Sequence, residues 1–234
     1  MITEPSLRER LEALADSRLA DFSRKLMPGV TRPVLGVRVP QLRTLARELA
    51  SRPDAGQWLS VDPARASFEE IVLAGLLVGR LKTDADTWFA RVADYVPLID
   101  NWAACDVPCS SFTRIRRDAE RGWAFLQPYL DSRQEYAQRF GIVMLLDHYV
   151  CDDWVDRVLE RLSHVDPAGY YARMALGWAL SVCFVKFPER TLPYLERPGL
   201  DAESHRMALQ KILESRRLSE AWRPLIVQLR QRKS

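Results

Sequence analysis

We predict an all-α fold of stacked helix pairs for this chain of 234 residues, and three observations carry the prediction. Apolar residues recur along most of the chain at the spacing of about three to four residues that one helix face requires. Strand-like alternation over more than four residues is absent, and hairpin dipeptides such as Asn-Gly do not occur. Ser, Thr, Asp or Pro opens most of the apolar stripes, as helix starts require.

The helices follow from these signals in chain order. The apolar stripe from Leu7 to Phe22 predicts one first helix, which ends before the break at Pro28–Pro33. Pro40 suits a first helical turn, and the stripe from Leu42 to Leu49 follows it. We expect further helices from Ser67 to Leu81, from Thr83 or Asp84 through Tyr95, from Asp131–Ser132 to Tyr149, from Asp152 to Leu162, from Asp166–Pro167 to Phe184, from Pro188 to Leu195, from Asp201 to Leu213, and from Ser219 onward.

The spacing of four of these starts indicates a repeat. Starts near residues 67, 131, 166 and 201 are separated by 64, 35 and 35 residues, which is a period of about 35. A helix pair of that length cannot bury its apolar face alone, so such pairs stack into a curved solenoid. We therefore expect a single helical-repeat domain over residues 1–234, with a concave face that binds an elongated partner.

Composition and charge limit the class of protein. Apolar residues make up 47% of the chain and charged residues 28%, and the formal net charge is +3. Arg dominates the cations and suits fork-shaped contacts to phosphate, although a bias in coding composition explains it equally well. Met1–Pro5 carries no signal-peptide pattern, and no apolar run approaches a bilayer span, so we expect a cytoplasmic protein.

Cofactor and metal signatures are absent from the sequence. The chain has no Gly-rich phosphate loop, no G-x-S-x-G elbow and no H-E-x-x-H motif. Its four cysteines, Cys105, Cys109, Cys151 and Cys183, do not form the close pairs of a zinc site. We expect buried free thiols, no metal and no cofactor.

Three aromatic clusters are candidates for chemistry. In Ile99–Asp106, Trp102 and Asp106 are four residues apart and share one helix face, where an indole and a carboxylate would both attract a cation. The alternative is a core Trp and a capping Asp. The second cluster is Tyr136–Phe140, followed by Asp147–Tyr149.

The third cluster is Tyr170–Leu180, in which Tyr171, Met174 and Trp178 share one helix face. Such a stripe is most often part of the core. Small residues around Trp178 would instead allow close helix packing or leave room for a partner, and the sequence leaves these alternatives open.

At these clusters the chain resembles the AlkD-like DNA alkylation repair family, whose members are DNA glycosylases on a HEAT-like repeat fold. The resemblance rests on four stretches in the same order, namely Leu35–Arg43, Asn101–Asp106, Tyr170–Phe187 and Gln210–Arg217. It implies a HEAT-like solenoid with a concave basic groove. It also implies a monomer that acts on double-stranded DNA carrying alkylated bases.

The resemblance further implies catalytic roles for Asp106, Trp102 and Trp178. The two indoles would contact the deoxyribose, and the carboxylate would face the anomeric carbon. N3- or N7-alkylated purines are cationic leaving groups, so a fixed carboxylate beside an oxocarbenium-like sugar suffices. The family implies that the damaged base need not be flipped into a pocket, in contrast to other glycosylases.

Cationic side chains along the chain are the expected phosphate contacts, although a solvated helix face is the alternative for each charge run. They are Arg38, Arg43, Arg114, Arg116, Arg117, Arg139, Arg173, Lys186, Lys211, Arg216 and Arg217. One departure stands out. The active family members carry an Arg-Arg pair where this chain has Arg139–Phe140, and the second Arg of that pair holds the DNA backbone. The phosphate contact is missing if Phe140 occupies that position and is kept if Arg139 does. That departure and the small net charge favour the rival hypothesis, a non-catalytic module that binds structured DNA or a protein.

Overall fold

The computed structural model describes residues 6–196 and 199–232, and this part of the chain is helical without any strand. The predicted all-α class is confirmed, and the packing of the helices is compatible with a HEAT-like repeat. The N-terminal segment Met1–Pro5, on which the expectation of no signal peptide rests, lies outside the described residues. The chain forms two compact units, which divide between Arg114 and Ile115. We call them unit 1 and unit 2 and describe each by itself.

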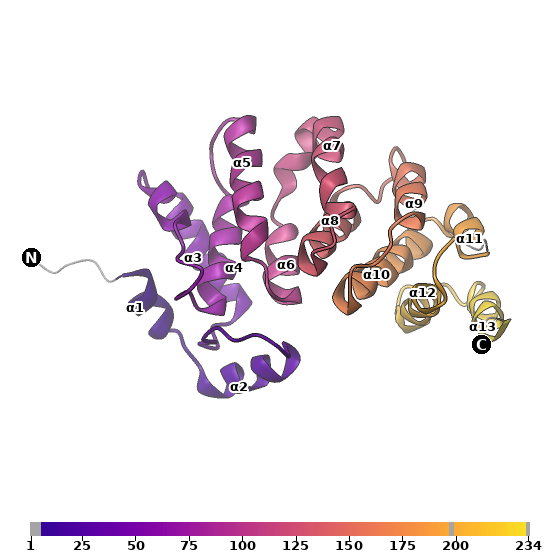
Figure 1. The fold of residues 1–234 in the computed structure, drawn as a ribbon, viewed down its shortest axis with the longest axis horizontal. Coiled ribbons are helices and arrows are strands. Elements are labelled where there is room, and N and C mark those ends of the chain that lie inside the picture. Colours follow the sequence, from indigo (N-terminus) through magenta and orange to yellow (C-terminus); the bar gives the residue numbers. More distant parts are fainter. Residues whose placement is uncertain (1–5, 197–198, 233–234) are drawn as a thin grey trace, which may run out of the picture. The chain divides into compact units, whose positions relative to one another are not determined.

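Unit 1 is centred on one apolar helix. In α4, every residue except Glu70 is buried, and α3, α5 and α6 pack against it (Figure 1). Ser67 starts α4 with a capping box, because its hydroxyl accepts from the Glu70 N–H while Glu70 accepts from the Ser67 N–H. The helices of unit 1 are α1 (Leu7–Glu12), α2 (Ser17–Leu26), α3 (Val39–Ala50), η1 (Ala55–Leu59), α4 (Phe68–Val78), α5 (Ala85–Tyr95), η2 (Val96–Leu98) and α6 (Trp102–Cys109).

The prediction of one first helix from Leu7 to Phe22 is wrong, because the chain breaks there into α1 and α2. Asp16 is the N-cap of α2, and its carboxylate accepts from the Leu19 N–H at 3.1 Å. The Asp16 N–H itself donates to Leu35 O at 3.2 Å, outside any helix. The apolar spacing continues across the break, so periodicity alone could not reveal it.

Unit 2 arranges its helices in two layers. Helices α8, α10 and α12 pack side by side, and α9 and α11 pack on each other and on α10 (Figure 1). A 3-10 helix, η3 (Thr113–Asp118), precedes them in the chain. The α-helices of unit 2 are α7 (Ala119–Leu130), α8 (Glu135–His148), α9 (Val155–Ser163), α10 (Tyr170–Lys186), α11 (Pro188–Glu196), α12 (Ala202–Glu214) and α13 (Arg223–Arg232).

Ion pairs between successive repeats of unit 2 agree with the predicted period. Arg157 pairs with Glu120 and Arg190 with Asp156, each at 2.6 Å, across 37 and 34 positions of sequence. These pairs connect α7 to α9 and α9 to α11. A period of about 35 residues therefore places matching positions of neighbouring helices next to one another.

Most predicted starts fall within a few residues of the observed ones. Asp84 and Asp201 are N-caps as expected. Helix α8 begins at Glu135 rather than at Ser132, whose hydroxyl accepts from the Gln134 N–H, and the last helix begins at Arg223. Helix α7, capped by Asp118, was not predicted.

Of the four free cysteines, Cys151 is exposed, which contradicts the expectation that all are buried.

Candidate functional site

Helix α6 carries the first pair of predicted site residues, Trp102 and Asp106. Asn101 caps the helix, because its side-chain oxygen accepts from the Ala104 N–H at 2.9 Å. Trp102 and Asp106 lie one turn apart on this helix, and both side chains are partly buried. The structure therefore places an indole and a carboxylate on one face of a capped helix, as the sequence predicts.

The indole of Trp102 is anchored and lines a pocket within unit 1. Its Nε1–H donates to the backbone oxygen of Leu26, at the end of α2, at 2.9 Å. The pocket has a volume of about 380 Å³ and lies among α2, α3, α4 and α6. Its lining is mainly apolar and includes Leu19, Leu26, Val37, Phe68, Trp102 and Val107.

A buried carboxylate holds one wall of this pocket. Glu69, on α4, is 1% exposed and accepts from the backbone N–H groups of Leu35, Gly36 and Val37 at 2.9, 2.7 and 3.3 Å. Gly36 has φ +82°, and a Cβ there would overlap the Asp16 backbone oxygen, so only glycine fits. These contacts fix the loop that leads into α3.

Two predicted phosphate contacts of unit 1 extend from α3 and its N-cap. Arg38 is exposed, lines the Trp102 pocket and lies 3.8 Å from the carboxylate of Asp16. Arg43 is partly buried, and its Nη2 donates to Val107 O at 3.2 Å and to the Ser110 hydroxyl at 3.1 Å. Arg43 thus joins α3 to the C-terminal end of α6.

Helix α10 carries the partly exposed aromatic stripe of unit 2. Tyr171, Met174 and Trp178 are each partly exposed, as are Val182 and Val185 further along the same face. The small residue beside Trp178 serves close packing, because a Cβ on Gly177 would lie 3.1 Å from Met207 on α12. The side chains of this stripe therefore remain partly accessible to solvent, and they are not sealed in the core.

Trp178 lines a second pocket, of about 440 Å³, with four of the predicted cationic residues. Lys186, Lys211, Arg216 and Arg217 come from the C-terminal ends of α10 and α12 and the loop after α12. One carboxylate, Glu214, stands among them. The pocket is consequently cationic around an indole wall.

The cations of this pocket differ in how they are held. Lys186 donates to Val150 O at 3.1 Å, and Lys211 pairs with Glu214 at 3.0 Å. The side chain of Gln210, followed by that of Lys211, lowers the pKa of Glu214 by hydrogen bonding. Arg216 and Arg217 are exposed, and within the described residues their guanidinium groups have no hydrogen-bond or ion-pair partner. These two side chains remain available to an external anion.

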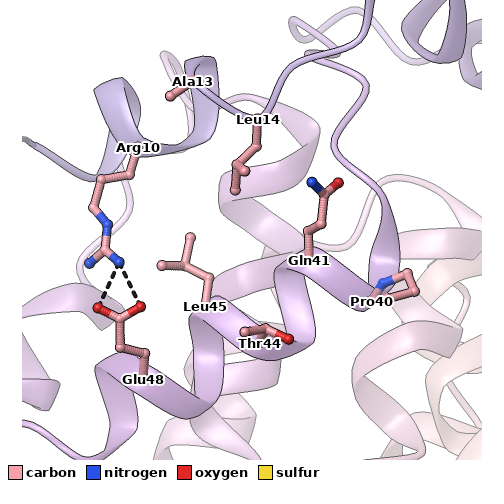
Figure 2. A pocket seen from close by; sticks show the side chains of 8 residues that line it. All are labelled: Arg10, Ala13, Leu14, Pro40, Gln41, Thr44, Leu45 and Glu48. Atoms are coloured by element: carbon pink, nitrogen blue, oxygen red, sulfur yellow. Dashed lines mark hydrogen bonds and ion pairs between the residues drawn. The ribbon is translucent and has the colours of Figure 1, made fainter.

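A further pocket, of about 540 Å³, lies between α1 and α3 and contains none of the predicted residues (Figure 2). Leu14 and Leu45 extend toward each other in it, and Pro40 lies at its edge (Figure 2). Nη2 of Arg10 donates to both carboxylate oxygens of Glu48 at 2.8 Å, so the charges of Arg10 and Glu48 balance each other.

A family model described as DNA alkylation repair enzyme matches residues 7–215. The chain belongs to this family. The match confirms the resemblance, and it makes the chain a DNA repair enzyme that acts on alkylated DNA. No curated protein and no solved structure matches the chain.

The structure shows where Arg139 and Phe140 lie, the two residues at which this chain differs from the Arg-Arg pair of the active family members. Arg139 is 6% exposed, and its Nη1 donates to Tyr171 O at 2.7 Å, between α8 and α10. Phe140 is fully buried. Because this guanidinium is buried and donates to a backbone carbonyl inside the fold, it is poorly accessible to a phosphate. In this family member, Arg139 joins two helices.

The remaining predicted cations have mixed environments. Arg173 is partly buried and pairs with Glu203 at 3.0 Å. Arg116 donates to His148 Nδ1 at 3.1 Å and to Asp147 O at 2.6 Å. Arg114 is partly buried and Arg117 is exposed. Arg117 is therefore the one of these four whose charge is most accessible.

Sequence reasoning missed the contribution of α2. Leu19, Ser23 and Leu26 line the Trp102 pocket, and Phe22 on the same helix is exposed. The available signal was the apolar stripe that continues beyond Leu14 to Leu19 and Phe22, which predicts one face of a single longer helix. Within the described residues, no cluster of ligands suits a metal ion, and no helix is long and apolar enough to cross a bilayer.

Proposed function

We propose that this repair enzyme is a DNA glycosylase that releases cationic N3- or N7-alkylated purines from duplex DNA. Membership of the alkylation repair family supports a DNA substrate with alkylated bases. The single observation that carries the glycosylase chemistry is the pair on α6. Trp102 and Asp106 lie one turn apart on one face, and both are partly exposed.

The proposed reaction needs only a carboxylate and an indole beside the sugar. The C1′–N bond breaks with its electron pair going to the alkylated base, which leaves as a neutral purine without protonation. The sugar becomes an oxocarbenium-like cation, which the Asp106 carboxylate stabilises by charge and the Trp102 indole by its quadrupole. A water oxygen then bonds to C1′ and gives up one proton to Asp106, which passes it to solvent.

The cationic pocket of unit 2 would bind phosphate groups of the DNA backbone. Lys186, Lys211, Arg216 and Arg217 surround Trp178 with more positive than negative charge, so phosphate binding there should weaken steeply with salt. In unit 1, Arg38 is the accessible cation beside Trp102. A contact between Trp178 and the deoxyribose stays a prediction, since it depends on how the two units are arranged.

The test is release of 7-methylguanine or 3-methyladenine from methylated duplex DNA under single-turnover conditions. The Asp106→Asn variant should lose about a hundredfold or more in rate, the typical effect of removing one charge-stabilising group from a transition state. Asp94→Asn is the matched control, because Asp94 is an exposed residue of α5 that forms an ion pair with Arg91 on the same helix. Equal rates for the wild type and Asp106→Asn would reject the proposal.

The burial of Arg139 and Phe140 favours one rival, a family member that binds DNA without releasing a base. Affinity for methylated, branched and plain duplexes at two salt concentrations separates the two. Tight binding with no base release would support the rival. Base release that depends on Asp106 would exclude it.

A further inference from the structure

Helix α6 carries a proline where a regular helix needs a hydrogen-bond donor. In a regular helix the carbonyl of Ala104 would accept from the N–H of residue 108, but Pro108 has none. Ala104 is fully buried, so water does not replace the missing donor. This carbonyl belongs to the turn of α6 that lies between Trp102 and Asp106.

A buried tyrosine supplies the missing hydrogen bond. The hydroxyl of Tyr95, at the end of α5, donates to Ala104 O at 2.6 Å, and Tyr95 is 2% exposed. Burial raises the pKa of this hydroxyl well above its usual range, so it remains a donor near neutral pH. Gly75 of α4 makes room for both partners, because a Cβ there would lie 2.5 Å from the Tyr95 ring and 2.7 Å from the Pro108 ring. The bond therefore joins α5 to the middle of α6.

Two helices of unit 2 also contain an internal proline, but in a different setting. Pro128 in α7 follows Ala124 by four residues, and Pro193 in α11 follows Glu189 by four. Both Ala124 and Glu189 are exposed, so water can take the place of the lost N–H. Among these three helices, α6 is the one whose freed carbonyl belongs to a fully buried residue.

Side chains also hold the two ends of α6. At its first turn, the indole of Trp102 donates to Leu26 O at 2.9 Å, and near its last turn Arg43 donates to Val107 O at 3.2 Å. The bond from Tyr95 fixes the turn between these two contacts. The direction of the Asp106 carboxylate depends on this turn, and a displacement of about 1 Å of a reacting group can cost a hundredfold in rate.

We propose that Tyr95 is a positioning residue for base release, because its hydroxyl holds the turn of α6 that presents Asp106 to the sugar. The inference rests on the proposed function and deepens it, since it names a residue that acts through Asp106 without touching the DNA. Pro108 frees the carbonyl of this turn, and Tyr95 binds it from the neighbouring helix. A residue with an N–H at position 108 would make the tyrosine hydroxyl dispensable, which gives the test.

Three variants separate the two possible donors to this carbonyl from a general loss of stability. Tyr95→Phe removes the hydroxyl and leaves Ala104 O without a donor. The double variant Tyr95→Phe, Pro108→Ala supplies an N–H from within the helix instead. Tyr149→Phe is the matched control, because Tyr149 is 1% exposed and its hydroxyl donates to Ala119 O at 2.8 Å in unit 2. Denaturant unfolding followed by circular dichroism measures the stability of each variant.

The rate of 7-methylguanine release at saturating methylated duplex is the first readout. Tyr95→Phe should lower this rate about tenfold or more, with less than about a twofold change in affinity for the duplex. The double variant should return to within about threefold of the wild-type rate. Tyr149→Phe should lose comparable stability and keep the wild-type rate, whereas a role in stability alone predicts the same rate for both Phe variants.

Two results would overturn the proposal. One is an unchanged rate for folded Tyr95→Phe, and the other is a double variant that regains stability but stays slow. If Tyr95→Phe does not fold, the double variant carries the test. It should then fold and release base at close to the wild-type rate, and a folded but slow double variant would again overturn the proposal.

Amide hydrogen exchange is a second readout, which does not depend on glycosylase activity. In Tyr95→Phe the amides of Asp106 and Val107 should exchange about tenfold faster, the scale of one hydrogen bond, and the double variant should restore slow exchange. If the wild type releases no base but exchange follows this pattern, the glycosylase falls while the hold of Tyr95 on α6 stands. If base release depends on Asp106 but neither rate nor exchange responds to Tyr95→Phe, the positioning role falls while the glycosylase stands.

Discussion

The two units of this chain use similar helices but connect them in different ways. In unit 1 the long-range ion pairs have irregular separations, such as 62 positions between Arg8 and Glu70 and 68 between Arg32 and Asp100. In unit 2 the pair of Arg157 with Glu120 spans 37 positions. In a regular repeat, ion pairs join equivalent positions of successive helices, so their separations in sequence are similar. In unit 1 the ion pairs join helices and loops at unequal separations in sequence.

Each unit also contains one buried polar side chain that holds a loop. In unit 1 it is Glu69, a carboxylate that accepts from three backbone N–H groups. In unit 2 it is Gln138, whose Nε2 donates to Leu130 O and Asp166 O and whose Oε1 accepts from the Ala168 N–H. An ionised carboxylate can only accept hydrogen bonds, whereas a side-chain amide can both donate and accept them. Glu69 therefore suits a loop that presents three N–H groups, and Gln138 suits one that presents two carbonyls and one N–H.

The difference extends to the candidate sites. Unit 1 holds the indole–carboxylate pair of α6 and a largely apolar pocket, whereas unit 2 holds a cationic pocket around Trp178. Under the proposed function, bond cleavage would lie in unit 1 and binding of the DNA backbone in unit 2, a separation of roles that we call the division of labour. Substitutions in each unit test whether the two units differ in this way.

The largest expected effect is on the stability of unit 1. Glu69→Ala should lower the free energy of unfolding by about 3 kcal/mol or more, because each buried N–H without an acceptor costs roughly 1–3 kcal/mol. Denaturant unfolding followed by circular dichroism measures it. Glu69→Gln keeps one acceptor oxygen and should lose less. A Glu69→Ala protein as stable as the wild type would contradict the role of this carboxylate.

The corresponding change in unit 2 should cost somewhat less. Gln138→Leu leaves two backbone carbonyls and one N–H without their side-chain partner, and we expect a loss of about 2 kcal/mol by the same measurement. Gln127→Leu is the control, since Gln127 is a partly exposed residue of the same unit. Equal losses for the two variants would mean that burial of the amide is not what matters.

Binding, rather than stability, should respond to the cationic pocket. The double variant Arg216→Ala, Arg217→Ala should weaken duplex affinity about tenfold near 0.1 M salt and reduce the slope of log K against log salt by roughly two. Arg206→Ala, an exposed cation of α12 outside the pocket, is the control. The rate of base release at saturating DNA should stay unchanged. A fall in that rate would argue against the division of labour.

The smallest effect concerns two exposed carboxylates. Hydrogen bonds from the backbone and side chain of Thr87 lower the pKa of Asp84, the N-cap of α5, to about 2. Its contribution to stability is therefore present above the unfolded-state pKa of about 4 and is lost as the pH falls through about 2. In unit 2, the hydrogen bond from Arg190 lowers the pKa of Asp156.

NMR titration of the two carboxylates at low and high salt separates these causes. Added salt should raise the pKa of Asp156 toward its ordinary value, because an exposed ion pair is screened, and should move that of Asp84 less. Asp84→Asn keeps a capping side chain and should remove the pH dependence at this position. A larger salt shift at Asp84 than at Asp156 would reverse the assignment of causes.

Local sequence signals predicted a good part of this structure. Ser67, Asp84 and Asp201 are caps in the structure because a capping hydrogen bond involves neighbours within three residues. Of the four starts that gave the period of about 35, Ser67 and Asp201 are N-caps in the structure, whereas α8 and α10 begin a few residues after the other two. The break at Asp16 escaped prediction because the apolar spacing continues across it, although Asp16 is a local N-cap to the Leu19 N–H.

The helical class, the caps, the repeat and the juxtaposition of Trp102 with Asp106 were determined by the sequence alone, since each depends on spacing within one helix or repeat. The tertiary structure decided which side chains face outward. It buries Arg139, leaves the Tyr171–Trp178 stripe partly exposed and gathers Lys186 and Arg216 in one pocket. Burial is set by the helices that pack from elsewhere in the chain, and no local pattern contains that information.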